Sequence, residues 1–436
     1  MRVALVTVLF AVLSALAFAQ VQTDQVDASF LAKAKPGTLH ISNAAGGGIL
    51  GTRSSGSLLG IDSLVNWSSY FYLPGFLSDQ FFGLPVAPQF TWQYTMVGHA
   101  PFGKGNDSDW QGETTWINAP IVPVNLDLRN FDGSPRFVNG HRLYSDATQY
   151  VTPVLKSPVF GKTFYGSSAP ATQYADAIQR AEFFNRSDSG WHTLLRPLVK
   201  TPRTMTLIRG TYRFALNSDG SCCLFVLIDV NTFSSLLFPL VPTDTSTVIG
   251  AAENAGDIRT RDLSTFLFPN AYLYFNGDPT QCCVLGFHSY DLEPGGPTNG
   301  FRERRYVVNY SSWISPGLFG SAFTDITALS HEIAEAFNDP FVTNATPWWL
   351  APNGVCQDNL ETGDVIEGLP DATFPITMNG FTYHPQNEAL VQWFASETPS
   401  SAISGAYSYP DTTVLPSASV SELPGCTGPF SFPPGK

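Results

Sequence analysis

The chain has few basic residues, with 23 Lys and Arg against 36 Asp and Glu among 436 residues, and its formal net charge is −13. Proteins bind nucleic acids and anionic membrane surfaces through concentrated Lys and Arg. We therefore expect neither a nucleic acid nor a membrane as a partner. Only 14% of the residues are charged, so charged side chains on an otherwise apolar helix are informative.

Long hydrophobic runs are missing after the first residues. No later run approaches the roughly 20 apolar residues that a membrane-spanning helix needs. The chain starts with Arg2, an apolar run from Val3 to Phe18 and the small residues Ala17 and Ala19, which is typical of a secretory signal peptide over residues 1–19. We expect a secreted, extracellular protein. Five Asn-X-Ser/Thr motifs are then candidate glycosylation sites, at Asn66, Asn106, Asn185, Asn309 and Asn344.

Cysteine is scarce, and none of the six cysteines has the Cys-X-X-Cys spacing of a zinc site. Cysteines of secreted proteins usually form disulfides. Neighbouring residues of a strand point to opposite faces, so the pairs Cys222-Cys223 and Cys282-Cys283 are expected to bridge one another across a sheet. Cys356 and Cys426 would then tie the C-terminal tail to the body of the protein.

Several hydrolase motifs are also absent. There is no Gly-X-Ser-X-Gly, which disfavours an α/β-hydrolase. Asp188-Ser189-Gly190 occurs once, whereas an aspartic protease needs two such loops, and the glycines at 46–48 lack the Lys-Ser/Thr of a phosphate-binding loop. A pair of carboxylates for glycoside hydrolysis stays open, because sequence does not show their separation.

The pattern of apolar residues and turns indicates a mixed α and β structure. Residues 121–128 alternate as a strand does, and residues 171–184 have helical spacing. Two hairpins have strong turn sequences: 207–216 pairs with 222–230 around Asn-Ser-Asp-Gly, and 265–275 pairs with 282–289 around Asn-Gly-Asp-Pro. The sequence therefore predicts an α+β fold, with a mixed or antiparallel sheet and hairpins packed on a helix.

That helix carries the most informative residues of the chain. An apolar stripe predicts a helix that begins near Thr324 and ends at Asn338-Asp339-Pro340; the stripe consists of Ile326, Leu329, Ile333 and Phe337. Within it, His331 and Glu335 stand four residues apart on one face, and Glu332 lies beside them. A His and a carboxylate at this spacing can reach one cation, with the neighbouring Glu as a base.

His331-Glu332-X-X-Glu335, followed by Glu361-Thr362-Gly363-Asp364, resembles the two-part motif of secreted gluzincins, a group of zincin metallopeptidases. Glu335 stands where the zincin motif has a second His. The resemblance implies a peptidase acting on proteins or peptides, with Zn²⁺ held by His331, Glu335 and Glu361. It further implies Glu332 as the general base, Asp364 as the support for the other ring nitrogen of His331, and Asp339 as a second supporting carboxylate. Ser330-His331-Glu332-X-X-Glu335 and Asp339-Pro340 are also similar to an uncharacterised secreted family that brings no known activity.

An oxygen-rich donor set suits Mn²⁺ or Ca²⁺ as well as Zn²⁺. His288 is an alternative ligand, although a lone strand His is more often structural, and Tyr290, Tyr383 or His384 would stabilise an oxyanion.

We expect a flexible segment over 20–60, a catalytic region over 61–396 as one domain or as two divided near residue 200, and a Ser/Pro/Gly-rich tail over 397–436. The rival hypothesis is a non-catalytic secreted or cell-wall protein that binds glycan or protein and keeps a degenerate or structural metal site.

Overall fold

The computed structural model describes residues 24–27, 29–33, 61–70, 89–99, 101, 114–166, 170–185, 187–216, 224–320, 323–350, 356–395 and 397–419. The predicted signal peptide, most of the segment 20–60 and the end of the tail lie outside the described residues. The chain contains both helices and strands in a mixed sheet, so the predicted α+β class is confirmed. No helix in the described part is long and apolar enough to span a bilayer.

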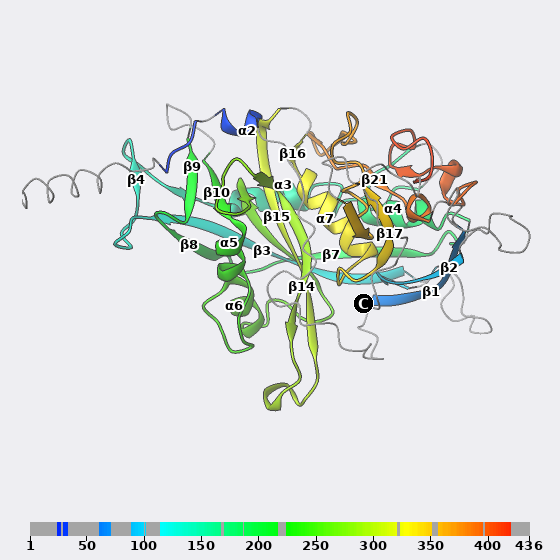
Figure 1. The fold of residues 1–436 in the computed structure, drawn as a ribbon, viewed down its shortest axis with the longest axis horizontal. Coiled ribbons are helices and arrows are strands. Elements are labelled where there is room, and N and C mark those ends of the chain that lie inside the picture. Colours follow the sequence, from blue (N-terminus) through cyan, green and yellow to red (C-terminus); the bar gives the residue numbers. More distant parts are fainter. Residues whose placement is uncertain are drawn as a thin grey trace, which may run out of the picture.

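An eight-stranded mixed sheet forms the centre of the molecule (Figure 1). Its main path is β14-β15-β11-β3-β6, while β7 and β8 pair with β3 and β16 pairs with β15. The strands are β3 (Thr114–Arg129), β6 (Tyr144–Ser145), β7 (His192–Val199), β8 (Arg203–Ile208), β11 (Leu263–Pro269), β14 (Gly286–Glu293), β15 (Arg304–Phe319) and β16 (Phe323–Asp325). The long strand β3 runs parallel to β7, β8 and β11, whereas β14 and β15 are antiparallel. The sheet thus joins segments from both sides of residue 200.

A four-stranded sheet in the order β13-β12-β10-β9 lies beside it. Its strands are β9 (Tyr212–Ala215), β10 (Phe225–Asp229), β12 (Ala271–Tyr274) and β13 (Cys282–Val284). The antiparallel pairs β9–β10 and β12–β13 lie within the two predicted hairpins. Three of the predicted strands are divided, however: 207–216 between β8 and β9, 265–275 between β11 and β12, and 282–289 between β13 and β14, with β8, β11 and β14 in the eight-stranded sheet. The predicted bridge between the vicinal cysteine pairs is wrong for Cys282 and Cys283, which are bonded to each other. Cys222, Cys223 and Cys426 lie outside the described residues.

Helices cover the two faces of the central sheet (Figure 1). On one face, α5 (Val230–Leu237) and α6 (Val248–Asn254) pack on an apolar core that includes Phe266 and Phe268 of β11. On the other, α7 (Thr327–Asn338) packs against Leu263 and Leu267 of the same strand. Alternate residues of a strand point to opposite faces, so one strand contributes to both layers. The helix α4 (Tyr174–Glu182) lies next to α7 and matches the helix predicted over 171–184.

The helix α7 follows from its sequence. The predicted apolar stripe is buried against the sheet. The helix stops before Asp339-Pro340, because proline has no N–H to donate to the preceding turn. After it, the Asp339 carboxylate accepts backbone hydrogen bonds from Thr343 at 2.8 Å and Asn344 at 3.0 Å. Asp339 therefore shapes the turn that leads the chain out of α7.

The remaining helices and strands lie outside these two sheets and the helices already named. They are α2 (Phe30–Lys33), β1 (Ile61–Tyr70), β2 (Gln89–Val97), β4 (Phe137–Val138), β5 (His141–Arg142), α3 (Val151–Leu155), β17 (Ala345–Leu350), β18 (Cys356–Asn359), β19 (Ile376–Met378), β20 (Phe381–Tyr383), β21 (Glu388–Ala389), α8 (Val391–Phe394) and β22 (Ser408–Tyr409). Asn309 and Asn344 are 0% and 4% exposed, so neither of these two glycosylation motifs has room for a glycan in the fold.

Candidate metal centre

The helix α7 presents three of the predicted site residues toward the interior of the protein. His331, Glu332 and Glu335 are 0%, 1% and 2% exposed. His331 Nε2 lies 3.0 Å from Glu335 Oε2 and 4.0 Å from Glu332 Oε1. The i and i+4 side chains therefore converge as predicted, with Glu332 next to them.

The second segment meets α7 at residues 361–364. Asp364 Oδ1 lies 3.6 Å from His331 Nε2, and the Gly363 amide donates a hydrogen bond of 2.9 Å to Glu335 Oε1. This contact fixes the Glu335 carboxylate and leaves its Oε2 facing His331. An added Cβ on Gly363 would lie 2.3 Å from His331 Nδ1, so only glycine lets this segment approach so closely.

The predicted supporting role of Asp364 needs correction. Asp364 faces the same ring nitrogen of His331 as Glu335 does, and the other nitrogen, Nδ1, lies 3.1 Å from Gln386 Oε1. Gln386 is itself oriented, because its Nε2 donates to the Gly363 carbonyl at 2.7 Å. Since Gln386 Oε1 can only accept, it places the His331 proton on Nδ1 and leaves the Nε2 lone pair for a cation. The sequence offered no signal for Gln386, because glutamine is not a usual motif residue.

His288, on β14, also belongs to the cluster. Its Nδ1 lies 3.3 Å from Glu335 Oε2 and 3.6 Å from Glu332 Oε2, and its Nε2 lies 3.7 Å from Glu361 Oε2. The structural role that a lone strand His usually has does not describe this environment. The sequence did contain one indication of this position. Phe287 and His288 are neighbours on a strand, so their side chains point to opposite faces of the sheet, and a histidine opposite an aromatic core can face a polar site.

Among the residues that the structure describes, there are two sets of three whose ligand atoms all lie within 4.8 Å of one another. One set is His331, Glu335 and Asp364, and the other is His288, Glu335 and Glu361. The predicted ligands His331, Glu335 and Glu361 are thus divided between two sets, which share only Glu335. The structure therefore contains acidic and histidine groups able to hold a metal ion.

Several buried polar atoms of the cluster have no hydrogen-bond partner. They are His288 Nε2, His331 Nε2 and both carboxylate oxygens of Glu332. A buried polar atom without a partner costs about 1–3 kcal/mol, and more if it is charged. Imidazole nitrogens and carboxylate oxygens are ligands of Zn²⁺ and Mn²⁺, so a cation would satisfy atoms that the protein leaves without hydrogen bonds. The residues present fit a metal ion.

Burial dominates the titration of the acidic groups. It raises the pKa of Glu332 to about 7 and, together with Glu335, that of Asp364 to about 6. Burial and the nearby Glu361 raise the pKa of Asp339 to about 7. Burial opposes ionisation of Glu335 too, but His331 and His288 hold its pKa well below the ordinary value. Glu335 is thus the carboxylate that the centre keeps ionised.

Other candidates named from the sequence have different surroundings. The Tyr383 hydroxyl donates to the Pro153 carbonyl at 2.9 Å, and His384 Nδ1 lies 2.7 Å from Asp325 Oδ2. Tyr290 packs edge-on against Phe341. The Tyr383 hydroxyl and His384 Nδ1 therefore bond to residues outside the metal centre.

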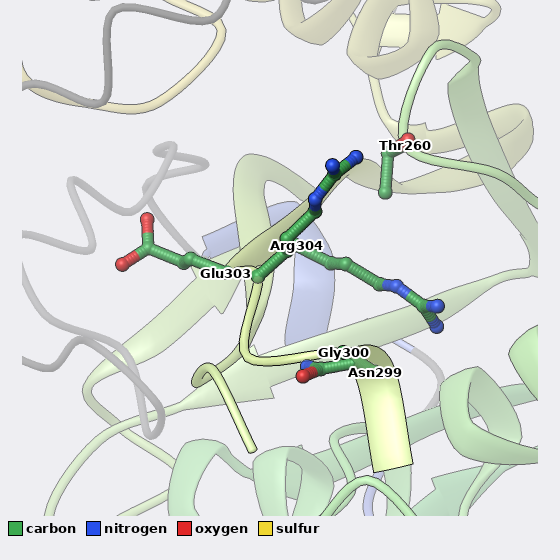
Figure 2. A pocket seen from close by; sticks show the side chains of 6 residues that line it. Thr260, Asn299, Gly300, Glu303 and Arg304 are labelled. Atoms are coloured by element: carbon green, nitrogen blue, oxygen red, sulfur yellow. The ribbon is translucent and has the colours of Figure 1, made fainter. Parts of the chain in front are cut away.

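The metal centre is buried in the interior of the protein. His288, His331, Glu332, Glu335, Glu361 and Asp364 are no more than 4% exposed. A surface hollow of about 550 Å³ lies apart from the metal centre. Figure 2 shows this hollow, with the Glu303 carboxylate pointing away from Thr260. The hollow is lined by Thr260, Asn299, Gly300, Arg302, Glu303 and Arg304. None of these residues belongs to the metal centre.

Comparison with known proteins yields no match to this chain among protein-family models, curated proteins or solved structures.

Proposed function

We propose that this chain is a metal-dependent hydrolase that cleaves peptide bonds with a metal-activated water. The observation that carries the proposal is the position of Glu332, a buried carboxylate without a hydrogen bond, beside the ring nitrogens of His288 on β14 and His331 on α7. A hydrolytic centre of this type needs ligands for the cation and a neighbouring free base. Peptide substrates are proposed from the resemblance of the motif to gluzincins.

The residues of the chain have distinct parts in this reaction. A bound cation would polarise the substrate carbonyl and make water a better nucleophile. Glu332 accepts the proton of the attacking water, and its pKa of about 7 suits a group that must take up and release a proton near neutral pH. Gln386 and the Gly363 amide hold His331 and Glu335 in place. The donor set favours Zn²⁺ or Mn²⁺, and Ca²⁺ needs more oxygen ligands than one set provides.

The proposed setting is outside the cell, as the N-terminal residues predict, with a protein or peptide as the partner.

The test compares metal content and peptide hydrolysis in wild type and in Glu332→Gln. The amide cannot accept the proton, so we expect metal content to stay the same while the hydrolysis rate falls by about 10²–10⁴-fold. Glu182→Gln is the matched control, because Glu182 is an equally buried glutamate on α4 and is absent from both ligand sets. Hydrolysis unchanged in Glu332→Gln, or a folded protein that takes up no metal, would contradict the proposal.

One observation favours a second function. The ligand residues are almost completely buried, which is typical of structural metal sites. In that case the protein binds glycan or another protein through its surface, and the metal only stabilises the fold. Stoichiometric metal without hydrolysis of any peptide in a broad library, together with a large drop in melting temperature on chelation, would support this alternative.

A further inference from the structure

We propose that the centre holds two divalent cations, bridged by Glu335, with His288 and Glu361 as the ligands of the second. This inference rests on the metal site of the proposed function but not on its hydrolytic activity. It assigns to His288 a role that goes beyond the helix motif.

The candidate ligands of the centre fall into two sets. The set of His331, Glu335 and Asp364 and the set of His288, Glu335 and Glu361 share only Glu335. Each set provides one imidazole and two carboxylates, which is a sufficient protein donor set for a divalent ion that also keeps water. Two complete sets indicate two positions.

The shared carboxylate of Glu335 is held in one orientation. Glu335 Oε1 accepts the Gly363 amide hydrogen bond, so its other oxygen is directed at the ligands. That oxygen, Oε2, lies 3.0 Å from His331 Nε2 and 3.3 Å from His288 Nδ1. A single oxygen between two imidazoles is suited to bridge two cations, which in paired sites lie about 3.5–4 Å apart.

His288 also has a buried ring nitrogen, Nε2, on the side of the ring that faces away from Glu335. His288 Nε2 has no hydrogen-bond partner, and the side chain is only 3% exposed. It points toward Glu361, whose Oε2 is 3.7 Å away, a gap too long for a hydrogen bond. Because a neutral imidazole carries only one proton, one of the two nitrogens of His288 presents a lone pair to a carboxylate, and a cation bound between that nitrogen and the carboxylate would satisfy both.

Charge balance points the same way. Six carboxylates are buried in or next to the centre, namely Glu332, Glu335, Asp339, Glu361, Asp364 and Glu388. If all six groups were ionised, their formal charge would be −6, which one divalent cation would reduce to −4 and two would reduce to −2. Because buried unbalanced charge is expensive, the second cation stabilises the folded state further.

The test titrates metal-free protein with Mn²⁺ and, separately, with Zn²⁺, and counts bound ions per chain. We expect two ions in wild type, one in His288→Asn and one in Asp364→Asn. Glu335→Gln should weaken both sites. His384→Asn is the control that keeps two ions, because His384 pairs with Asp325 outside the centre. With both sites filled by Mn²⁺, electron paramagnetic resonance should show two spin-coupled ions.

Each result has one meaning for the inference. One ion in wild type, two ions in His288→Asn, or two magnetically isolated Mn²⁺ ions would each overturn it. Circular dichroism checks the fold of each variant, and Glu361→Gln replaces His288→Asn if that variant does not fold. Two bound ions without peptide hydrolysis would support the two-cation centre and contradict the proposed hydrolase function. One bound ion with peptide hydrolysis would support the hydrolase function and contradict the two-cation centre.

Discussion

The two faces of the strands β14 and β15 differ sharply in what they bury. On one face, Phe287 lies opposite Tyr310, with ring centroids 5.2 Å apart, in an aromatic core beneath α5. On the other, His288 lies opposite Asn309 and faces the carboxylates of α7. The two pairs occupy consecutive positions along each strand.

The difference shows how one sheet can serve stability and chemistry at once. The aromatic face is satisfied by burial and ring packing alone. The other face keeps polar atoms without hydrogen bonds, since both amide atoms of Asn309 and the Nε2 of His288 have none. Unsatisfied polar atoms reduce stability, so a protein retains them where they bind something. We therefore expect the aromatic face, with Phe287 and Tyr310, to stabilise the fold by itself. The polar face, with His288 and Asn309, should stabilise it only when a ligand is bound.

Among the variants considered, Phe233→Ala is expected to have the largest effect, and it should act on the aromatic face alone. Phe233 is fully buried and packs on Tyr310, Phe268 and Phe287, with ring centroids at 4.7, 5.2 and 6.2 Å. We expect the free energy of unfolding to fall by about 3–5 kcal/mol, with metal content unchanged. Denaturant unfolding and metal analysis measure the two quantities.

Leu240→Ala is the control for this prediction. Leu240 is 87% exposed, so its removal should change the free energy of unfolding by less than about 0.5 kcal/mol. If Phe233→Ala also released the metal, the two faces would not be separate in function and the comparison would fail.

Much of this arrangement could be predicted from the sequence, for local reasons. The apolar stripe and the Asn-Asp-Pro stop located α7, and turn sequences located both hairpins, because these signals depend on neighbours along the chain. The position of Gln386 beside His331 depends on contacts across 55 residues, and no local pattern carries that information. Likewise, the sequence could place His288 on a strand but could not show that β14 lies against α7.

A second prediction concerns Glu182, a buried carboxyl outside the metal centre. Its Oε1 accepts a hydrogen bond from Asn338 at 3.0 Å, and burial raises its pKa to about 8. The unfolded chain releases this proton near the ordinary pKa of 4.5. The protonated form therefore stabilises the fold fully below about pH 4.5, and this contribution is lost as pH rises through about 8.

We therefore expect Glu182→Gln to make stability less dependent on pH. Between pH 5 and 8, the free energy of unfolding of wild type should fall on the order of a few kcal/mol further than that of the variant. Urea unfolding at several pH values, with metal removed from both proteins, measures this difference. Parallel pH profiles would show that Glu182 titrates alike in the folded and unfolded states.

The smallest predicted effect separates metal affinity from stability on the polar face. In Gly363→Ala, the new Cβ would lie 2.3 Å from His331 Nδ1, so the imidazole must move away from Gln386. Losing an orienting partner of a metal-bound histidine weakens binding by about 10–100-fold. The dissociation constant measured by metal titration should rise by this factor.

Gly296→Ala is the matched control for Gly363→Ala. The nearest atom to a Cβ at Gly296 is 4.0 Å away, so this variant should bind metal as wild type does. Unchanged affinity in Gly363→Ala would mean that His331 is not held by Gln386 for metal binding. A loss of affinity without a comparable loss of metal-free stability would instead show that the polar face is organised around its ligand, as the aromatic face is organised around its own packing.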